Sequence, residues 1–502
     1  MKYNYYINSF LWSTICKLLN AFLGFISIPM LIKHFGPDTY GVLGIAIASN
    51  AYMQLFDLGL NTGAIKFFSE WREKGALEQI NRTAKSSLCI YLIFGFINAL
   101  IFISIAIWGE NLFNISHEQF LILRKLFLIL STLTILSWIN TVFNQLLISA
   151  QLVSFTQKVT SWIIILKFIL IYVTVHFNIN VTTFYFIQSL LITSTIIPLS
   201  YKCIKVKLID KIEFKFYWND IKVILIYCLN IFLLSLLQMS ATQTRPIILG
   251  IFAEDATQAI TYYRTIEVFP LFLITIGTSL SNIFLPKASA AIGNDNITNI
   301  HKISISGTTI CTVIACCLCF PVILNAKALL FLYMGTEYTH LSWLLQIWCI
   351  AVIMQIQSSP NYSLAISTGK TKILVLWTLV SSILSISINI VLCPKYGIIS
   401  AILCYVGYVI INMAFNYIYY YKKLLHLSRQ EMINSFLKPF SGAFIILTIL
   451  LIFYPEDLSI NSKLNGIFTI IIQSGLFIFT YLLIIHFFKI FNFKDLYKAI
   501  LK

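Results

Sequence analysis

Charged residues are scarce in this sequence. Aspartate, glutamate, lysine and arginine make up only 11% of its 502 residues, whereas apolar residues make up 59%. A soluble domain is roughly a quarter charged, so this composition excludes a water-soluble globular protein. The apolar runs also lack the strict alternation of barrel strands. The sequence therefore predicts an all-α polytopic membrane protein.

Motifs for catalysis and metal binding are lacking as well. No HExxH or GxSxG sequence occurs, and the seven histidines are scattered. The cysteines lie almost entirely within apolar runs, without histidines at ligand spacing, which indicates reduced, buried thiols. The stretch STGKTK (367–372) lacks a glycine of the phosphate-binding loop, because Leu364 stands five positions before Gly369. We therefore expect no enzyme, no catalytic residues, no metal site and no cofactor.

What the sequence does contain is a series of apolar runs, each about 20 residues long, which is the length of a membrane-spanning helix. We predict fourteen such helices, and an even number places both chain termini on the same side of the membrane. Their approximate ranges are 8–32, 41–62, 87–108, 119–147, 159–177, 181–201, 222–252, 260–284, 303–325, 340–365, 373–393, 398–421, 439–455 and 466–487.

The 35 basic residues are distributed unevenly between the predicted loops. The two largest inner loops, around 63–86 and 202–221, are rich in lysine. The outer loops contain only four basic residues: Lys33, Lys327, Lys395 and Lys463. Because inner loops of membrane proteins carry the excess of basic residues, we expect both termini to be cytoplasmic. The formal charge of +16 then reflects topology and contact with membrane lipids, and it requires no nucleic acid partner.

A short internal repeat relates the two halves of the chain. LIKHFGPDTYGVLGI (31–45) and ILGIFAEDATQAITYYRTI (248–266) each place a phenylalanine, an aspartate and a tyrosine between two apolar runs. The repeat relates the first helix to the seventh, so the halves share one orientation and a pseudo-twofold axis along the membrane normal. We therefore predict two six-helix lobes, at 1–213 and 214–421, followed by two terminal helices and a cytoplasmic tail at 422–502.

The repeat-related helices carry stripes of polar residues at helical spacing, which on the second predicted helix are Asn50, Gln54, Asp57 and Asn61. The stripes have two interpretations. They hold helices together within a bundle, with Arg264 and Glu267 pairing three residues apart, or they line a hydrated central cleft, where charges inside membranes are usually found. We favour the cleft for the charged residues. The predicted substrate-binding residues are Lys17, Asn20, Gln238, Thr242, Arg245 and Arg264.

The predicted cleft has a cationic character. Its basic residues outnumber its two acidic residues, Asp57 and Glu267, which are candidates for coupling transport to an ion gradient. Low-dielectric walls focus such a field on an anionic group, and guanidinium groups match the oxygens of a phosphate or diphosphate. Lys167 is central in the fifth predicted helix without a polar stripe, so both a structural and a binding role stay open for it.

Three stretches of the sequence resemble the polysaccharide (O-antigen) flippases of the multidrug/oligosaccharidyl-lipid/polysaccharide exporter superfamily. They are HFGPDTYG (34–41), YMQLFDLGLNTGAIKFF (52–68) and PKYGIISAILCYV (394–406). The resemblance implies that two lobes move a polyprenyl-diphosphate-linked oligosaccharide from the inner to the outer leaflet of a bacterial plasma membrane by alternating access. It also implies a cationic cavity, at Lys17, Arg245 and Arg264 here. Glycan polymerase and chain-length machinery are the further expected partners.

Three alternatives remain at this point. A lipid-linked peptidoglycan precursor flippase would use the same cationic cavity. A drug/cation antiporter of the same superfamily would want an acidic one, for which only Asp57 and Glu267 are available. A membrane glycan polymerase or ligase handles similar lipids, but by resemblance it would carry a large outer loop, and no such loop is predicted.

Overall fold

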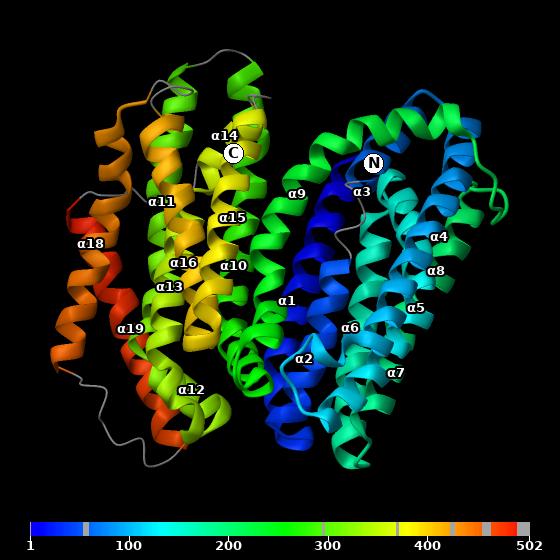
Figure 1. Cartoon of the computed structure of the whole chain (residues 1–502). Coiled ribbons are helices and arrows are strands. Elements are labelled where there is room, and N and C mark those ends of the chain that lie inside the picture. Colours follow the sequence, from blue (N-terminus) through cyan, green and yellow to red (C-terminus); the bar gives the residue numbers. More distant parts are fainter. Residues whose placement is uncertain are drawn as a thin grey trace. The chain divides into compact units, whose positions relative to one another are not determined.

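The structure of the chain is a computed structural model that describes residues 2–53, 60–293, 297–367, 371–421, 427–453 and 463–488. Within these ranges nearly all residues are helical, and no β-strand occurs in them (Figure 1). The all-α fold predicted from the sequence is confirmed.

The helices of the first half of the chain are α1 (Lys2–Phe35), α2 (Pro37–Met53), α3 (Leu60–Glu73), α4 (Leu77–Trp108), α5 (His117–Ser149), α6 (Val153–His176), α7 (Val181–Thr193), α8 (Ile196–Lys205) and α9 (Trp218–Phe252). Those of the second half are α10 (Ala256–Gly293), α11 (Ile297–Leu324), α12 (Ala326–Met334), α13 (Ser342–Ile356), α14 (Ser359–Ser367), α15 (Thr371–Tyr396), α16 (Ile398–Phe415), α18 (Arg429–Phe453) and α19 (Lys463–Phe487). Short 3₁₀ turns precede α5 and α13, and a π turn extends α16.

The chain divides into two compact units. The first unit comprises Met1–Thr261 with Cys393–Gly397, and the second comprises Tyr262–Leu392 with Ile398–Lys502. Helix α9 belongs to the first unit because it packs on α2, α3 and α4. The predicted lobes are defined by helix order rather than by packing, and their boundaries at residues 213 and 421 stay a prediction.

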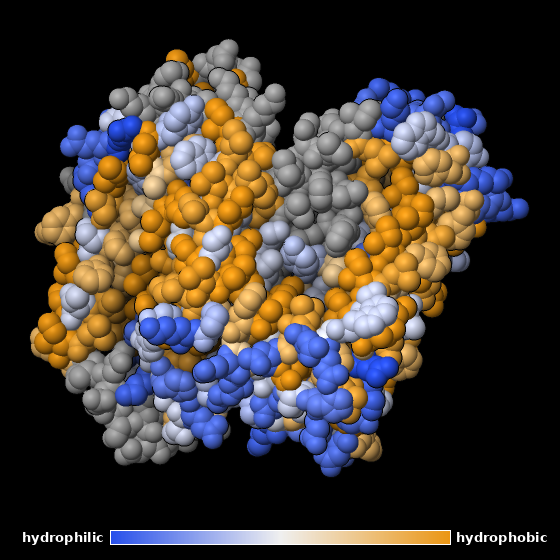
Figure 2. All heavy atoms as spheres, viewed as in Figure 1, coloured by the Kyte–Doolittle hydropathy of each residue, from blue (hydrophilic) through white to orange (hydrophobic). Residues whose placement is uncertain are grey.

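The helices have the length and the surface of membrane-spanning segments. Twelve helices in the described ranges are long and apolar enough to cross a membrane. In Figure 2, apolar residues cover the sides of the helices, and hydrophilic residues gather toward the helix ends. Val391 and Ile452, for example, are 74% and 77% exposed. Such exposure is unfavourable in water and is expected for side chains that face lipid, so the chain is a multi-pass membrane protein.

Two of the fourteen expected spans are not among these twelve. The span predicted at 41–62 includes residues 54–59, which lie outside the described ranges, and the described helix α2 has 17 residues. The span predicted at 222–252 falls within α9, many of whose central side chains also lie outside the description. The count of fourteen therefore stays a prediction.

Helices α4 and α5 form the tightest helix pair of the first unit. Gly95 on α4 allows this approach, because a Cβ atom there would lie only 2.9 Å from Cα of Ile135. One turn away, Tyr91 packs on Trp138 with ring centroids 5.7 Å apart, and Gln145 Nε2 donates a hydrogen bond to the Tyr91 hydroxyl at 2.6 Å. This close packing fixes the orientation of α5.

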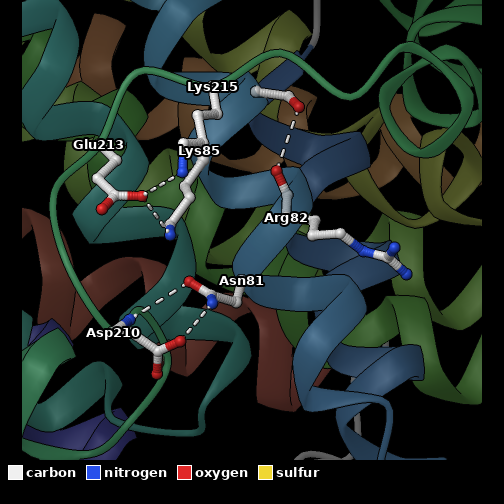
Figure 3. A network of polar contacts seen from close by, with 7 residues as sticks. Asn81, Arg82, Lys85, Asp210, Glu213 and Lys215 are labelled. Atoms are coloured by element: carbon white, nitrogen blue, oxygen red, sulfur yellow. Dashed lines mark hydrogen bonds and ion pairs between the residues drawn. The ribbon is translucent and has the colours of Figure 1, made fainter.

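The connection between α8 and α9 is bonded to the first turns of α4 (Figure 3). Lys85 Nζ lies 2.9 Å from Glu213 Oε2, and Lys215 Nζ lies 3.3 Å from the same oxygen. Asn81 Nδ2 donates to Asp210 Oδ2 at 2.6 Å. The backbone N–H of Tyr217, the residue before α9, donates to Ser86 Oγ at 2.8 Å. The point at which α9 begins is therefore fixed against α4.

Helix α11 has a central place in the second unit, where it packs against α13, α14, α18 and α19. A buried polar cluster joins it to α14. Asn361 Nδ2 donates to Thr308 Oγ1 at 2.9 Å, and the Asn361 carbonyl oxygen accepts a hydrogen bond from Ser304. Because buried polar groups are costly unless paired, this cluster fixes the register of the two helices.

Candidate functional site

The predicted substrate-binding residues Arg264 and Lys17 lie in different environments. Arg264 on α10 is largely buried and forms an ion pair with Glu267, with 2.7 Å between Nη1 and Oε2. The side chains of this pair are 17% and 13% exposed. Lys17 and Asn20 are instead exposed on α1. The pairing of Arg264 with Glu267, one of the two interpretations of the sequence, is present in the structure.

Arg245 lies on α9, the helix that packs on α2, α3 and α4 in the first unit. Its side chain is only 3% exposed. A buried charge within a membrane-spanning segment is costly and usually has a functional or pairing role. In this structure Arg245 is therefore covered by protein.

The remaining predicted residues are placed less completely. The side chains of Gln238 and Thr242 lie outside the described part of α9, and Asp57 lies outside the described residues altogether. Lys17 and Arg245 belong to the first unit, whereas Arg264 belongs to the second. Their convergence on one cationic cleft therefore stays a prediction.

The two segments that the internal repeat aligns contact each other at the start of α2 and the start of α10. Thr257 Oγ1 donates a hydrogen bond to Asp38 Oδ1 at 2.8 Å, and Thr261 Oγ1 donates to the carbonyl oxygen of Pro37 at 2.6 Å. The backbones approach so closely that a Cβ atom at Gly41 would lie 2.3 Å from the carbonyl oxygen of Thr257. Corresponding corners of the two repeats therefore form one tightly fitted junction.

A pocket of about 260 Å³ opens between α2, α3 and α5 within the first unit. Its described lining consists of neutral side chains. These are Asn50, Met53, Asn61, Thr134, Ser137, Trp138, Thr141 and Asn144. We refer to it as the amide pocket.

The sequence predicts some of the residues that line the amide pocket and does not predict the others. Asn50 and Asn61 belong to the polar stripe predicted on the second helix. The α5 residues of the lining are not among the predicted stripes, although Thr134, Ser137, Thr141 and Asn144 recur at spacings of three, four and three residues. That spacing is the same helical signal that selected the other stripes.

Comparison with known proteins identifies the fold. No family model matches the sequence, and no curated protein matches it either. Among solved structures, the lipid II flippase MurJ in an inward closed conformation matches with a TM-score of 0.72 and 17% identity, covering 98% of this chain and 100% of that one. The chain has the fold of these transporters.

Two further structures extend the comparison. An inward-facing multidrug resistance MATE family transporter of the MOP superfamily has a TM-score of 0.67 and 14% identity, over 88% of this chain and 98% of that one. A MOP superfamily transporter from Pyrococcus furiosus, described as having a binding pocket of reverse polarity, has a TM-score of 0.53 and 15% identity, over 87% and 96%. Both structures are described as transporters, and what this chain shares with them is the fold.

Proposed function

We propose that this chain is a flippase that moves a polyprenyl-diphosphate-linked oligosaccharide, such as an O-antigen or capsule repeat unit, across a bacterial plasma membrane. The observation that carries the proposal is its similarity to a lipid II flippase over 98% of this chain and the whole of that one. Two structures described as multidrug resistance transporters each match 88% of the chain. A fold shared with a carrier of lipid-linked glycan favours a substrate of the same chemical class.

The chemistry of the charged residues suits such a substrate. A diphosphate with its sugars cannot cross hydrocarbon unaided, whereas the polyprenyl tail remains in lipid throughout. Arg245 and Arg264 would bind phosphate oxygens through their guanidinium groups, and Lys17 would add a third positive charge. Outward movement of the anionic head group is also favoured by an inside-negative potential, at about 2.3 kcal/mol per charge per 100 mV.

In alternating access, a change of conformation would expose the Arg245 side chain. Its side chain is 3% exposed in this structure, so the helices that cover α9 must separate before a phosphate is bound. The transport direction is from the cytoplasmic to the outer leaflet, with both chain termini cytoplasmic. Asp57 and Glu267 are the residues through which an ion gradient would be coupled. A glycan polymerase with its chain-length machinery would take the product.

Flipping of a lipid-linked peptidoglycan precursor is the second candidate, because a protein described as a lipid II flippase matches over the whole of its length. A drug/cation antiporter fits less well. Such a protein would want an acidic cavity, whereas the charge of Glu267 is balanced by Arg264 at 2.7 Å.

Deletion of the gene tests the proposal. We expect the surface glycan to disappear while its lipid-linked precursor accumulates on the cytoplasmic face, and we expect the wild-type gene to restore the glycan. Loss of viability with accumulation of lipid II would favour the second candidate. Unchanged surface glycan and unchanged precursor levels would contradict both.

A further inference from the structure

The amide pocket carries an inference beyond the phosphate-binding residues. At about 260 Å³ it holds several times the volume of one water molecule, which is about 30 Å³. Small-molecule pockets begin at about 300 Å³, so the amide pocket has the size for one small ring rather than for an extended ligand. Its ligand is therefore compact or is one part of a larger molecule.

The lining of the pocket identifies the chemistry of that ring. Asn50 and Asn61 supply amides from the α2–α3 side, while Ser137 and Asn144 supply a hydroxyl and an amide from α5. Amides and hydroxyls both donate and accept hydrogen bonds, as the hydroxyl groups of a sugar require. A phosphate would instead need basic side chains, and the described lining is neutral.

Trp138 gives the pocket an aromatic wall. Its indole is held by Tyr91 and Phe94 of α4, at ring-centroid distances of 5.7 and 5.9 Å, and Trp138 is 7% exposed. Its exposed part lines the pocket and offers an apolar contact for the C–H groups of a pyranose. The α5 wall is equally rigid, because Gly95 brings α4 against Ile135. The pocket is thus pre-organised, which lowers the entropic cost of binding.

The position of the pocket along α5 suits substrate loading. Helix α5 runs from His117 to Ser149, and the pocket residues Thr134–Asn144 lie in its second half. In the topology proposed above, that half faces the cytoplasm, where the lipid-linked glycan is presented.

We propose that the amide pocket binds one neutral sugar ring of the lipid-linked substrate, separately from the arginines that bind the diphosphate. The proposal rests on the flippase function proposed above. It assigns glycan recognition to the first unit and to residues of α2, α3 and α5.

Binding of two classes of lipid by the full-length protein in nanodiscs tests this assignment. The probes are undecaprenyl diphosphate, and a panel of undecaprenyl-diphosphate monosaccharides carrying glucose, galactose or N-acetylglucosamine. The test variants are Thr134→Val and Asn144→Leu. Thr132→Val is the matched control, because Thr132 lies on the same helix but is exposed and donates its hydroxyl to the Ile129 carbonyl at 2.8 Å.

Wild-type protein and Thr132→Val should bind at least one of the monosaccharide lipids more tightly than undecaprenyl diphosphate. Each test variant should reduce that preference about threefold to tenfold, the effect of losing one neutral hydrogen bond. Binding of undecaprenyl diphosphate should stay unchanged, which also shows that the variants are folded.

The outcomes separate the two proposals. If the variants keep the wild-type preference, or if wild type shows no preference while still binding polyprenyl diphosphate, the amide pocket is not a sugar site and the flippase proposal stands. If wild type binds none of these lipids, the flippase proposal fails and the sugar site fails with it. Loss of binding to both lipids in a variant that unfolds at the wild-type temperature would also contradict a separate sugar site.

Discussion

The ion pair between Arg264 and Glu267 allows a structural role to be separated from a role in transport. If Arg264 only holds α10 together, the pair should be replaceable by two neutral residues. If Arg264 binds a phosphate, its charge is required even when the pair is no longer needed for stability. The informative set is Glu267→Gln, Arg264→Gln and the double variant Arg264→Gln/Glu267→Gln.

The expected stability loss follows from the geometry of the pair. Two unit charges about 4 Å apart attract by about 4 kcal/mol at an effective dielectric constant of about 20. Both side chains are largely buried, at 17% and 13% exposure. Removing one partner of a buried pair typically costs about 3–5 kcal/mol, because the other charge is left unpaired. Arg264 has a further interaction in the structure, so its charge keeps one partner when Glu267 is replaced. We therefore expect Glu267→Gln to lower the free energy of unfolding by about 3 kcal/mol.

Thermal unfolding of the purified variants in nanodiscs, followed by tryptophan fluorescence, measures the stability part. Both single variants should unfold at lower temperature than wild type, and the double variant should recover much of the loss. Restoration of surface glycan measures transport. Glu267→Gln should retain part of it, whereas Arg264→Gln and the double variant should lose it. A stable double variant with full activity would refute a phosphate-binding role for Arg264.

Three further predictions concern other parts of the chain. Gly41→Ala places a Cβ atom 2.3 Å from the Thr257 carbonyl oxygen, so the substitution overpacks this contact. We expect it to destabilise the protein by about 1–3 kcal/mol, which is measured as a lower unfolding temperature. The Lys85 and Lys215 ammonium groups beside Glu213 lower the pKa of that carboxyl. Protection of residues 206–217 from hydrogen exchange should therefore be full above its ordinary pKa and fall as the pH drops through the lowered one. Arg245→Ala should abolish complementation at normal protein levels.

Matched controls accompany these predictions. Gly24→Ala should be neutral, because no atom lies within 4 Å of a Cβ built there. Glu213→Gln should remove the pH dependence of hydrogen exchange, whereas Glu78→Gln should not, since the Glu78 side chain is 83% exposed. Unfolding of Gly41→Ala at the wild-type temperature, pH-independent protection in wild type, or full complementation by Arg245→Ala would contradict the corresponding prediction.

Local helical periodicity explains most of what the sequence predicted correctly. The all-α fold followed from the length of the apolar runs. The Arg264–Glu267 pair followed from a spacing of three residues, which places both side chains on one face of a helix. The α5 wall of the amide pocket obeys the same periodicity at Thr134–Asn144. These residues are not predicted as a site, because uncharged serine and threonine within an apolar run are commonly packing residues.

Contacts between distant residues explain what the sequence did not predict. Lys85 and Glu213, which form an ion pair, are 128 residues apart. The structure also pairs Lys215 with Glu213 and places Lys202 over the ring of Phe155. Contact of the loop around 202–221 with membrane lipids stays a prediction. Likewise, the repeat indicated similar corners at Asp38 and Asp255, but not that one corner bonds to the other.

Reconstitution into vesicles tests the central claim most directly. Purified protein is placed in liposomes that contain an undecaprenyl-diphosphate-linked oligosaccharide in the inner leaflet, and an external lectin measures how fast the sugar becomes accessible. The account predicts that accessibility rises in a protein-dependent manner, faster with an inside-negative potential, and that Arg264→Gln abolishes the rise. Sugar that stays inaccessible with correctly folded wild-type protein, at every potential, would contradict the flippase assignment.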